Sequence, residues 1–222
     1  MANIIRSPKS CGKWDDNELI AYNITVTAVP SQQFFPQGTD VPLTAAGLDP
    51  ALATADSYSI SDFACQLLIT LGFEEHRYRV CRRLEIPLEI CDDIRKFAEI
   101  SLGLQDLGST EMVPLLQMNK TQIGRSNVEA HMISAAIAAY QFNNSMRQEK
   151  GLHPLDAMTM PLPLSDAVIS CQYPSARTEV LKCEVASDCK GGMEALEYRL
   201  VALQYYVAFK SLAKSHWEKF IP

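Results

Sequence analysis

The sequence contains no long hydrophobic run, and this absence limits where the protein is expected to work. Among its 222 residues, no stretch approaches the roughly 18 apolar residues that a membrane-spanning helix needs. The first eight residues, Met1 to Pro8, include no apolar run of the length found in secretory signal peptides. We therefore expect a cytoplasmic protein that does not bind membranes.

Positive charge is also scarce. The 20 lysines and arginines stand against 26 acidic residues, which gives a net charge of −6. Nucleic-acid phosphates are bound by basic surfaces, so no nucleic-acid partner is expected. Four arginines, Arg77, Arg79, Arg82 and Arg83, form the one basic cluster. We interpret this cluster as the solvent-exposed face of a strand rather than as a phosphate-binding strip.

Closely spaced metal ligands are missing as well. The seven cysteines are odd in number and scattered, and no pair has the Cys-x-x-Cys spacing of a zinc or redox site. The four histidines show no metal-ligand spacing either. This pattern indicates reduced thiols in a cytosolic protein, and no bound metal is expected.

The composition that remains is typical of a soluble globular protein, with 47% hydrophobic and 21% charged residues. Residues 1–58 show little helical periodicity and include four prolines between positions 30 and 56. We expect this segment to be an N-terminal arm packed on the domain. Residues 59–222 are expected to form a single domain.

Hydrophobic periodicity, together with the positions of glycine and proline, predicts the helices and strands of that domain. Apolar residues at helical spacing favour helices over 59–71, 127–148 and 193–220, with Gly72 and Gly151 ending the first two. Residues 14–18 can start a short helix. Alternating or short apolar runs predict strands over 20–29, 77–90, 97–104, 112–117, 157–164 and 178–186. Pro87 makes the second half of its strand an edge or a bend. The fold class is therefore α+β, with a small mixed β-sheet flanked by helices.

This order of elements, together with Glu99, Lys120 and the tail residues Gly192-Met193-Glu194 and His216-Trp217, resembles a known family. It is similar to the PD-(D/E)XK nuclease-like superfamily, in a form common in mushroom-forming fungi. The resemblance implies a nuclease-like core with a long C-terminal helix. In that family two acids and a lysine on neighbouring strands hold a divalent ion and activate water.

The family motif is degraded in this sequence. Lys120 stands at the motif lysine and Glu99 at the second-strand acid, but Met118 replaces the acid two positions before the lysine. Gln66 lies where many members carry a glutamate on the first helix. A thioether and an amide do not replace two carboxylates as ligands for Mg²⁺. The resemblance therefore implies the fold without the nuclease reaction.

A fold of this kind that has lost its metal keeps a cleft between sheet and helix, which favours a non-catalytic binding protein. Size, acidic character and the fungal resemblance point to a pigment-binding role, with a non-covalent conjugated polyene carboxylic acid as the ligand. The partner is thus a small apolar organic acid, held by an apolar lining and a cation at its rim. The expected ligand-binding residues are Met118, Lys120, Met132, Ile133, Ala136 and Tyr140.

Two alternatives stay open at this point. One is a divergent metal-dependent nuclease in which Glu99, Gln117 and Lys120 suffice. The other is a structural or interaction protein that forms a homodimer through the segment 30–56 or the helix 193–220.

The cysteine pattern gives a first testable prediction. Thiol titration of the unfolded, unreduced protein is expected to count all seven cysteines of the sequence. A count of about three or fewer would indicate disulfides and contradict the cytoplasmic assignment.

Overall fold

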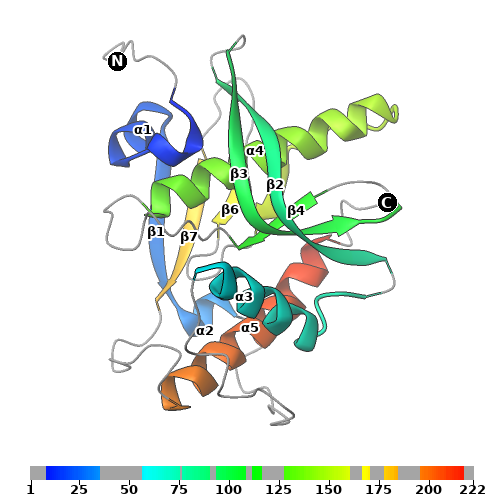
Figure 1. Cartoon of the computed structure of the whole chain (residues 1–222). Coiled ribbons are helices and arrows are strands. Elements are labelled where there is room, and N and C mark those ends of the chain that lie inside the picture. Colours follow the sequence, from blue (N-terminus) through cyan, green and yellow to red (C-terminus); the bar gives the residue numbers. More distant parts are fainter. Residues whose placement is uncertain are drawn as a thin grey trace.

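A computed structural model of the protein describes residues 9–35, 57–75, 77–90, 94–108, 112–116, 128–160, 167–170, 178–184 and 196–217. These residues form an α+β fold in which helices surround small β-sheets (Figure 1). The helices are η1 (Cys11–Lys13), α1 (Asp16–Ala21), α2 (Ser31–Phe34), α3 (Ser57–Thr70), α4 (Val128–Glu149) and α5 (Leu196–Trp217). The strands are β1 (Ile24–Pro30), β2 (Tyr78–Ile90), β3 (Ile94–Asp106), β4 (Met112–Leu116), β5 (Ala157–Met160), β6 (Ala167–Ser170) and β7 (Thr178–Glu184).

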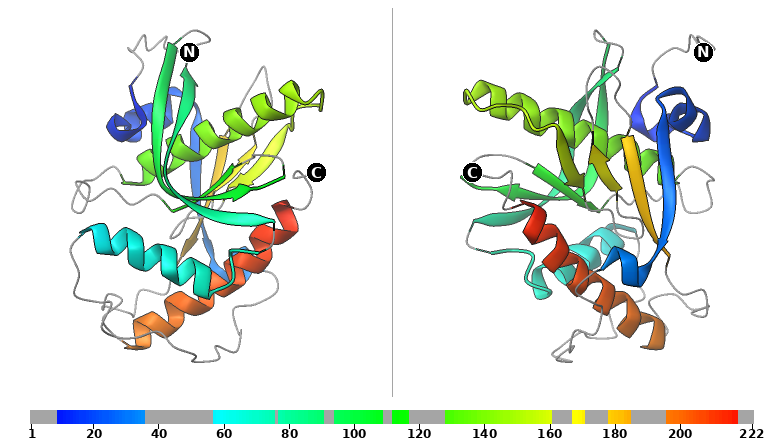
Figure 2. Two further views of the ribbon diagram at one scale, coloured as in Figure 1. Left: turned by 45° about the vertical axis from the view of Figure 1, so that its right-hand side comes forward. Right: turned by 180° about the vertical axis from the view of Figure 1, so that it is seen from behind.

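The described strands pair into three small sheets, where we expected a single mixed sheet. The largest is antiparallel, in the order β2-β3-β4. A parallel pair joins β1 to β7, and an antiparallel pair joins β5 to β6. The rear view of Figure 2 shows β6, β7 and β1 following one another across the molecule. Parallel and antiparallel pairing thus occur in separate sheets.

The three-stranded sheet confirms that the segments 97–104 and 112–117 pair antiparallel, and the described ladder joins residues 102–105 of β3 to residues 112–116 of β4. Leu104 of β3 stands opposite Val113 of β4, and Leu102 stands opposite Leu116. The β2–β3 hairpin is longer, and its register runs from Tyr78 and Asp106 at the open end to Ile90 and Ile94 near the turn. Successive strand residues point to opposite faces, and one face of β3 is almost fully buried. Its buried residues are Ala98, Ile100, Leu102, Leu104 and Asp106.

An ion pair closes the open end of this hairpin. The guanidinium of Arg77 donates to both carboxylate oxygens of Asp106, from Nε to Oδ1 at 2.8 Å and from Nη2 to Oδ2 at 3.0 Å. The backbone N–H of Leu107 donates to the carbonyl of Arg77, and that of Gly108 donates to Asp106 Oδ1. A carboxylate that is only 1% exposed requires such partners, because a buried charge without them is costly.

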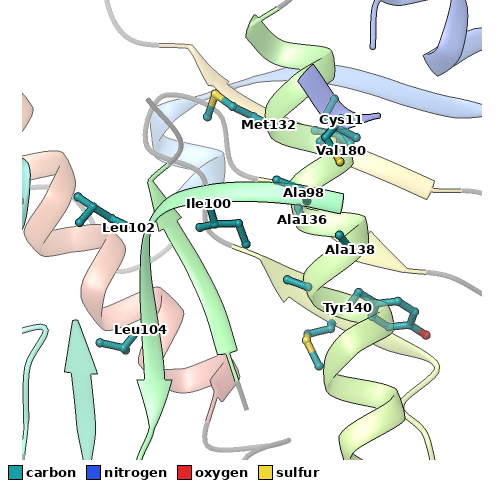
Figure 3. Close-up of a cluster of buried hydrophobic side chains, with 14 of the residues drawn as sticks. Cys11, Ala98, Ile100, Leu102, Leu104, Met132, Ala136, Ala138, Tyr140 and Val180 are labelled. Atoms are coloured by element: carbon teal, nitrogen blue, oxygen red, sulfur yellow. The ribbon is translucent and has the colours of Figure 1, made fainter. Parts of the chain in front are cut away.

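Helix α4 covers the sheet and confirms the helix predicted over 127–148. It packs against β2, β3 and β4, while α3 packs against β2 and β3 (Figure 1). The residues of α4 that pack into the core are mostly small: Ala130, Ala135, Ala136, Ala138 and Ala139 are buried. Figure 3 shows side chains from α4 and β3 in one cluster of buried hydrophobic residues.

The N-terminal segment corrects one expectation and confirms another. We expected a strand over 20–29, but residues 16–21 form helix α1 and the strand begins at Ile24. A capping box starts the helix: Asp15 accepts from the N–H of Asn17, and the N–H of Asp15 donates to Glu18. These bonds start the helix within the predicted residues 14–18. In the helix, the side chain of Ile20 is 72% exposed.

The same segment contributes to the core. Strand β1 pairs with β7 in a parallel ladder that begins at Ile24 and Thr178. Trp14, Phe34 and Phe35 belong to the buried hydrophobic cluster. The division into an arm at 1–58 and a domain at 59–222 stays a prediction, and the described part of the arm supplies a strand.

Glycines end two of the long helices, as predicted. Gly72 has a positive φ of 75°, which a residue without a Cβ adopts most easily. The N–H of Gly72 donates to Ile69 at 2.9 Å, and the N–H of Phe73 donates to Leu68 at 3.0 Å. This pair of bonds is the Schellman motif. The equivalent bonds close α4 at Gly151.

A substitution pair tests these helix ends. Gly72→Ala and Gly151→Ala are each expected to lower the free energy of unfolding by about 1 kcal/mol, because both positions have positive φ. The two losses are expected to be similar. A Cβ at Gly72 would lie 2.8 Å from Nζ of Lys210, but this atom ends a flexible side chain that can move away, and a Cβ at Gly151 meets nothing within 4 Å. Urea unfolding of both variants measures the two losses, and a loss at Gly72 several-fold larger than at Gly151 would contradict this account.

Candidate functional site

The structure brings four of the six predicted ligand-binding residues together on helix α4. Met132, Ile133, Ala136 and Tyr140 lie within about 100° of the helix circumference, given 3.6 residues per turn. All four are buried and belong to the hydrophobic cluster. Figure 3 labels Met132, Ala136 and Tyr140. They form a continuous apolar stripe, which we call the α4 face.

The other two predicted residues, Met118 and Lys120, lie outside the described residues, as does Gln117 of the nuclease alternative. Strand β4, which ends at Leu116, is the described element that precedes them, and it packs beside α4. The rim cation expected at Lys120 stays a prediction.

The polar end of Tyr140 is bonded to the chain itself. Its hydroxyl donates to the carbonyl of Leu155, in the segment that returns from the end of α4. Asn144 holds the same residue with both amide atoms: Nδ2 donates to the Leu155 carbonyl at 3.1 Å, and Oδ1 accepts from its N–H at 2.8 Å. The return segment is therefore fixed against α4, and the ring of Tyr140 is packed in the hydrophobic cluster.

A second amide lies deeper in the apolar cluster. Asn143 is 1% exposed, and its Nδ2 lies 3.4 Å from the sulfur of Met158, which is buried equally. Sequence reasoning missed Asn143 and Asn144. Two adjacent asparagines inside a helix were the available signal, because asparagine has low helix propensity and persists there when its amide is bonded.

A buried polar cluster, formed by Cys11, His131 and Ser134, lies where η1 meets α4. The hydroxyl of Ser134 donates to the carbonyl of His131 at 2.7 Å. Burial raises the pKa of the Cys11 thiol to about 11, although a hydrogen bond with Ser134 opposes the shift. The thiol is therefore protonated at neutral pH and is a poor nucleophile.

The histidine of this cluster is neutral for the same reason. Its side chain packs against η1, with Cε1 3.9 Å from the position that a Cβ of Gly12 would occupy. Burial lowers the pKa of His131 below the ordinary value of 6.5. His131 is thus a packed residue of the protein interior.

The structure describes two of the residues that correspond to the nuclease motif, Gln66 and Glu99. Gln66 is exposed on α3, and Glu99 stands in β3 opposite the exposed Glu85 of β2. Within the described ranges, no three His, Cys, Asp or Glu side chains gather as a metal site.

Four cysteines are free thiols: Cys11, Cys65, Cys81 and Cys183. The prediction of free cysteines is confirmed for these four, and the other three lie outside the described residues. Among the described helices, none is sufficiently long and apolar to cross a membrane.

Comparison with known proteins yields no relative: no family model, curated protein or solved structure matches the chain.

The buried histidine gives a pH prediction. Because the folded-state pKa of His131 lies below the unfolded value of 6.5, its contribution to stability is complete above that pH. The contribution is lost as the pH falls towards the folded-state pKa. His131→Gln is therefore expected to flatten the fall in unfolding free energy between about pH 7 and 5, which is at most about 1.4 kcal/mol per pH unit.

His153→Gln serves as the matched control, because His153 is exposed. Urea unfolding at several pH values measures both variants. An acid slope that His131→Gln leaves unchanged would assign the effect to other groups.

Proposed function

We propose that the protein is a non-catalytic binding protein that holds an elongated apolar organic acid against the α4 face. A conjugated polyene carboxylic acid, bound without a covalent bond, is the proposed ligand. The observation that carries this proposal is the stripe of Met132, Ile133, Ala136 and Tyr140 on one side of a single long helix. The stripe rises about 12 Å along the helix, and its apolar character suits a polyene chain.

The side chains of the stripe suit this ligand. Methionine is flexible and polarisable, so Met132 can adapt to a flat conjugated chain. The ring of Tyr140 offers a face for stacking, while its hydroxyl is already bonded to Leu155. Burial of apolar surface contributes roughly 25 cal/mol per Å², so a polyene that buries a few hundred Å² reaches micromolar affinity or better.

Lys120 is the proposed partner for the acid group. It follows Leu116, the last residue of β4, by four positions, and β4 packs beside α4. Four residues span at most about 14 Å, so the Cα of Lys120 cannot lie farther than that from the Cα of Leu116. A lysine ammonium beside a carboxylate adds a charge-assisted hydrogen bond.

The sequence resemblance supports the same function. The degraded PD-(D/E)XK motif favours binding over metal-dependent hydrolysis. In size, acidic character and its resemblance to that fungal family, the sequence looks like the pink chromoprotein of oyster mushrooms, which binds a conjugated polyene carboxylic acid. We propose that the protein is a cytoplasmic chromoprotein of this kind, on a nuclease-like core that needs no metal.

An absorption experiment tests the proposal. Protein purified from its natural source is expected to absorb visible light, and mass spectrometry of an organic extract identifies the pigment. Recombinant protein is expected to shift the spectrum of added polyene acids, because an ordered apolar site changes the environment of the conjugated chain. Lys120→Ala is expected to weaken binding of an acid more than that of its methyl ester, because only the acid loses a charge partner.

Lys150→Ala is the matched control, since Lys150 is an exposed lysine directly after α4, ten residues beyond Tyr140. Equal losses for acid and ester would remove Lys120 from the site. Absence of a retained pigment together with no spectral shift would overturn the proposal. Metal-dependent cleavage of DNA or RNA that disappears in Lys120→Ala would favour the nuclease alternative.

A further inference from the structure

Strand β1 has one paired edge and one unpaired edge. It pairs with β7 along its whole length, from Ile24 to Pro30. On its other edge, no hydrogen bond joins its backbone to any part of the chain that the structure describes. In the rear view of Figure 2, β1 lies on the outer side of β7.

The edge of β2, unlike that of β1, is protected against pairing with another strand. The side-chain amide of Gln141 on α4 binds both backbone groups of Glu89, accepting from its N–H and donating to its carbonyl, each at 3.0 Å. Since strand residues alternate with a period of two, Pro87 faces the same edge and offers no N–H there. An added strand therefore finds no ladder at this end of β2.

Among the described residues, the β1 edge carries no comparable protection between Ile24 and Val29, and its one proline, Pro30, stands at the end of the strand. Natural proteins block open edges with charged residues, proline or a covering element. The six residues before Pro30 are Ile-Thr-Val-Thr-Ala-Val, with no charge, and five of them are β-branched. Thr27 and Ala28 are exposed at the middle of the strand. This is a surface suited to pairing with another strand.

We propose that the β1 edge is a self-association site, at which β1 of a second copy of the chain pairs antiparallel about a two-fold axis. A second copy fits because the edge is self-complementary. A two-fold axis places one residue opposite its own counterpart, and Thr27 is the central residue of Ile24–Pro30. Thr27 then faces Thr27 of the second copy, and Val26 faces its Ala28, so neither contact brings like charges together.

The size of the contact sets the expected affinity. A seven-residue strand buries far less than the roughly 1,200 Å² of a standard interface, so the dimer is expected to be weak, with a Kd on the order of micromolar. The dimer joins two parallel strand pairs into one sheet in the order β7-β1-β1-β7. This assembly does not involve the α4 face and is independent of the proposed ligand.

Sedimentation velocity over about 1 to 200 μM, a range that brackets the expected Kd, tests the proposal. The native chain is expected to shift from monomer to dimer, and Thr27→Lys is expected to remain monomeric, because a charge at the centre of the edge opposes pairing. Ile20→Lys is the matched control, since Ile20 is an exposed apolar residue of the neighbouring helix α1. A native chain that stays monomeric at the highest concentration overturns the proposal, as does a dimer that survives Thr27→Lys.

Cysteine cross-linking tests the register. In the proposed pair the two Cα atoms of residue 27 lie roughly 4.5–5.5 Å apart, which a disulfide can bridge. The two residues 25 lie four positions out of register, roughly 13 Å apart. Mild oxidation is expected to link Thr27→Cys into a dimer and to leave Thr25→Cys unlinked. Equal cross-linking of the two variants would contradict the proposed pairing.

Discussion

Close contact between α4 and the three-stranded sheet is the constraint on which the rest of the structure depends. Alanines such as Ala135, Ala136 and Ala139 are fully or almost fully buried, so the helix backbone lies near the strands. Protein interiors are packed as densely as organic crystals, and a larger side chain at these positions would push the helix away from the sheet. Several hydrogen bonds form with the helix in this position. Gln141 bonds to β2, and Tyr140 and Asn144 bond to the return segment.

Local signals predicted much of this arrangement from the sequence. Helical spacing and a terminal glycine defined α3 and α4, and two apolar runs defined β3 and β4. The predicted start of the strand over 20–29 was wrong because two local signals competed. Alternation of Ile20, Tyr22 and Ile24 favoured a strand, but the capping box of Asp15 and Glu18 stabilises a helix through residue 21. The hydrogen bonds of a cap are fixed by a few residues and override a weak alternating pattern.

Contacts between distant segments were harder to foresee. The α4 face followed from helical spacing alone, so Met132, Ile133 and Ala136 were found together. The Cys11–Ser134 contact and the Leu155 partner of Tyr140 were not, because each depends on how a remote segment returns to the helix. Parallel pairing of β1 with β7 has no local signature either, since no turn connects the two strands.

That parallel ladder also sets an order of events during synthesis. Residue 24 pairs with residue 178, so β1 leaves the ribosome long before its partner exists. The β2–β3 hairpin and α4, whose partners lie close in sequence, can form while the chain is still growing. Strand β1 meanwhile has both edges unsatisfied and is exposed to pairing with other nascent chains. Strand β1 is therefore made well before β7, and it cannot complete its native ladder until residues 178–184 have been made.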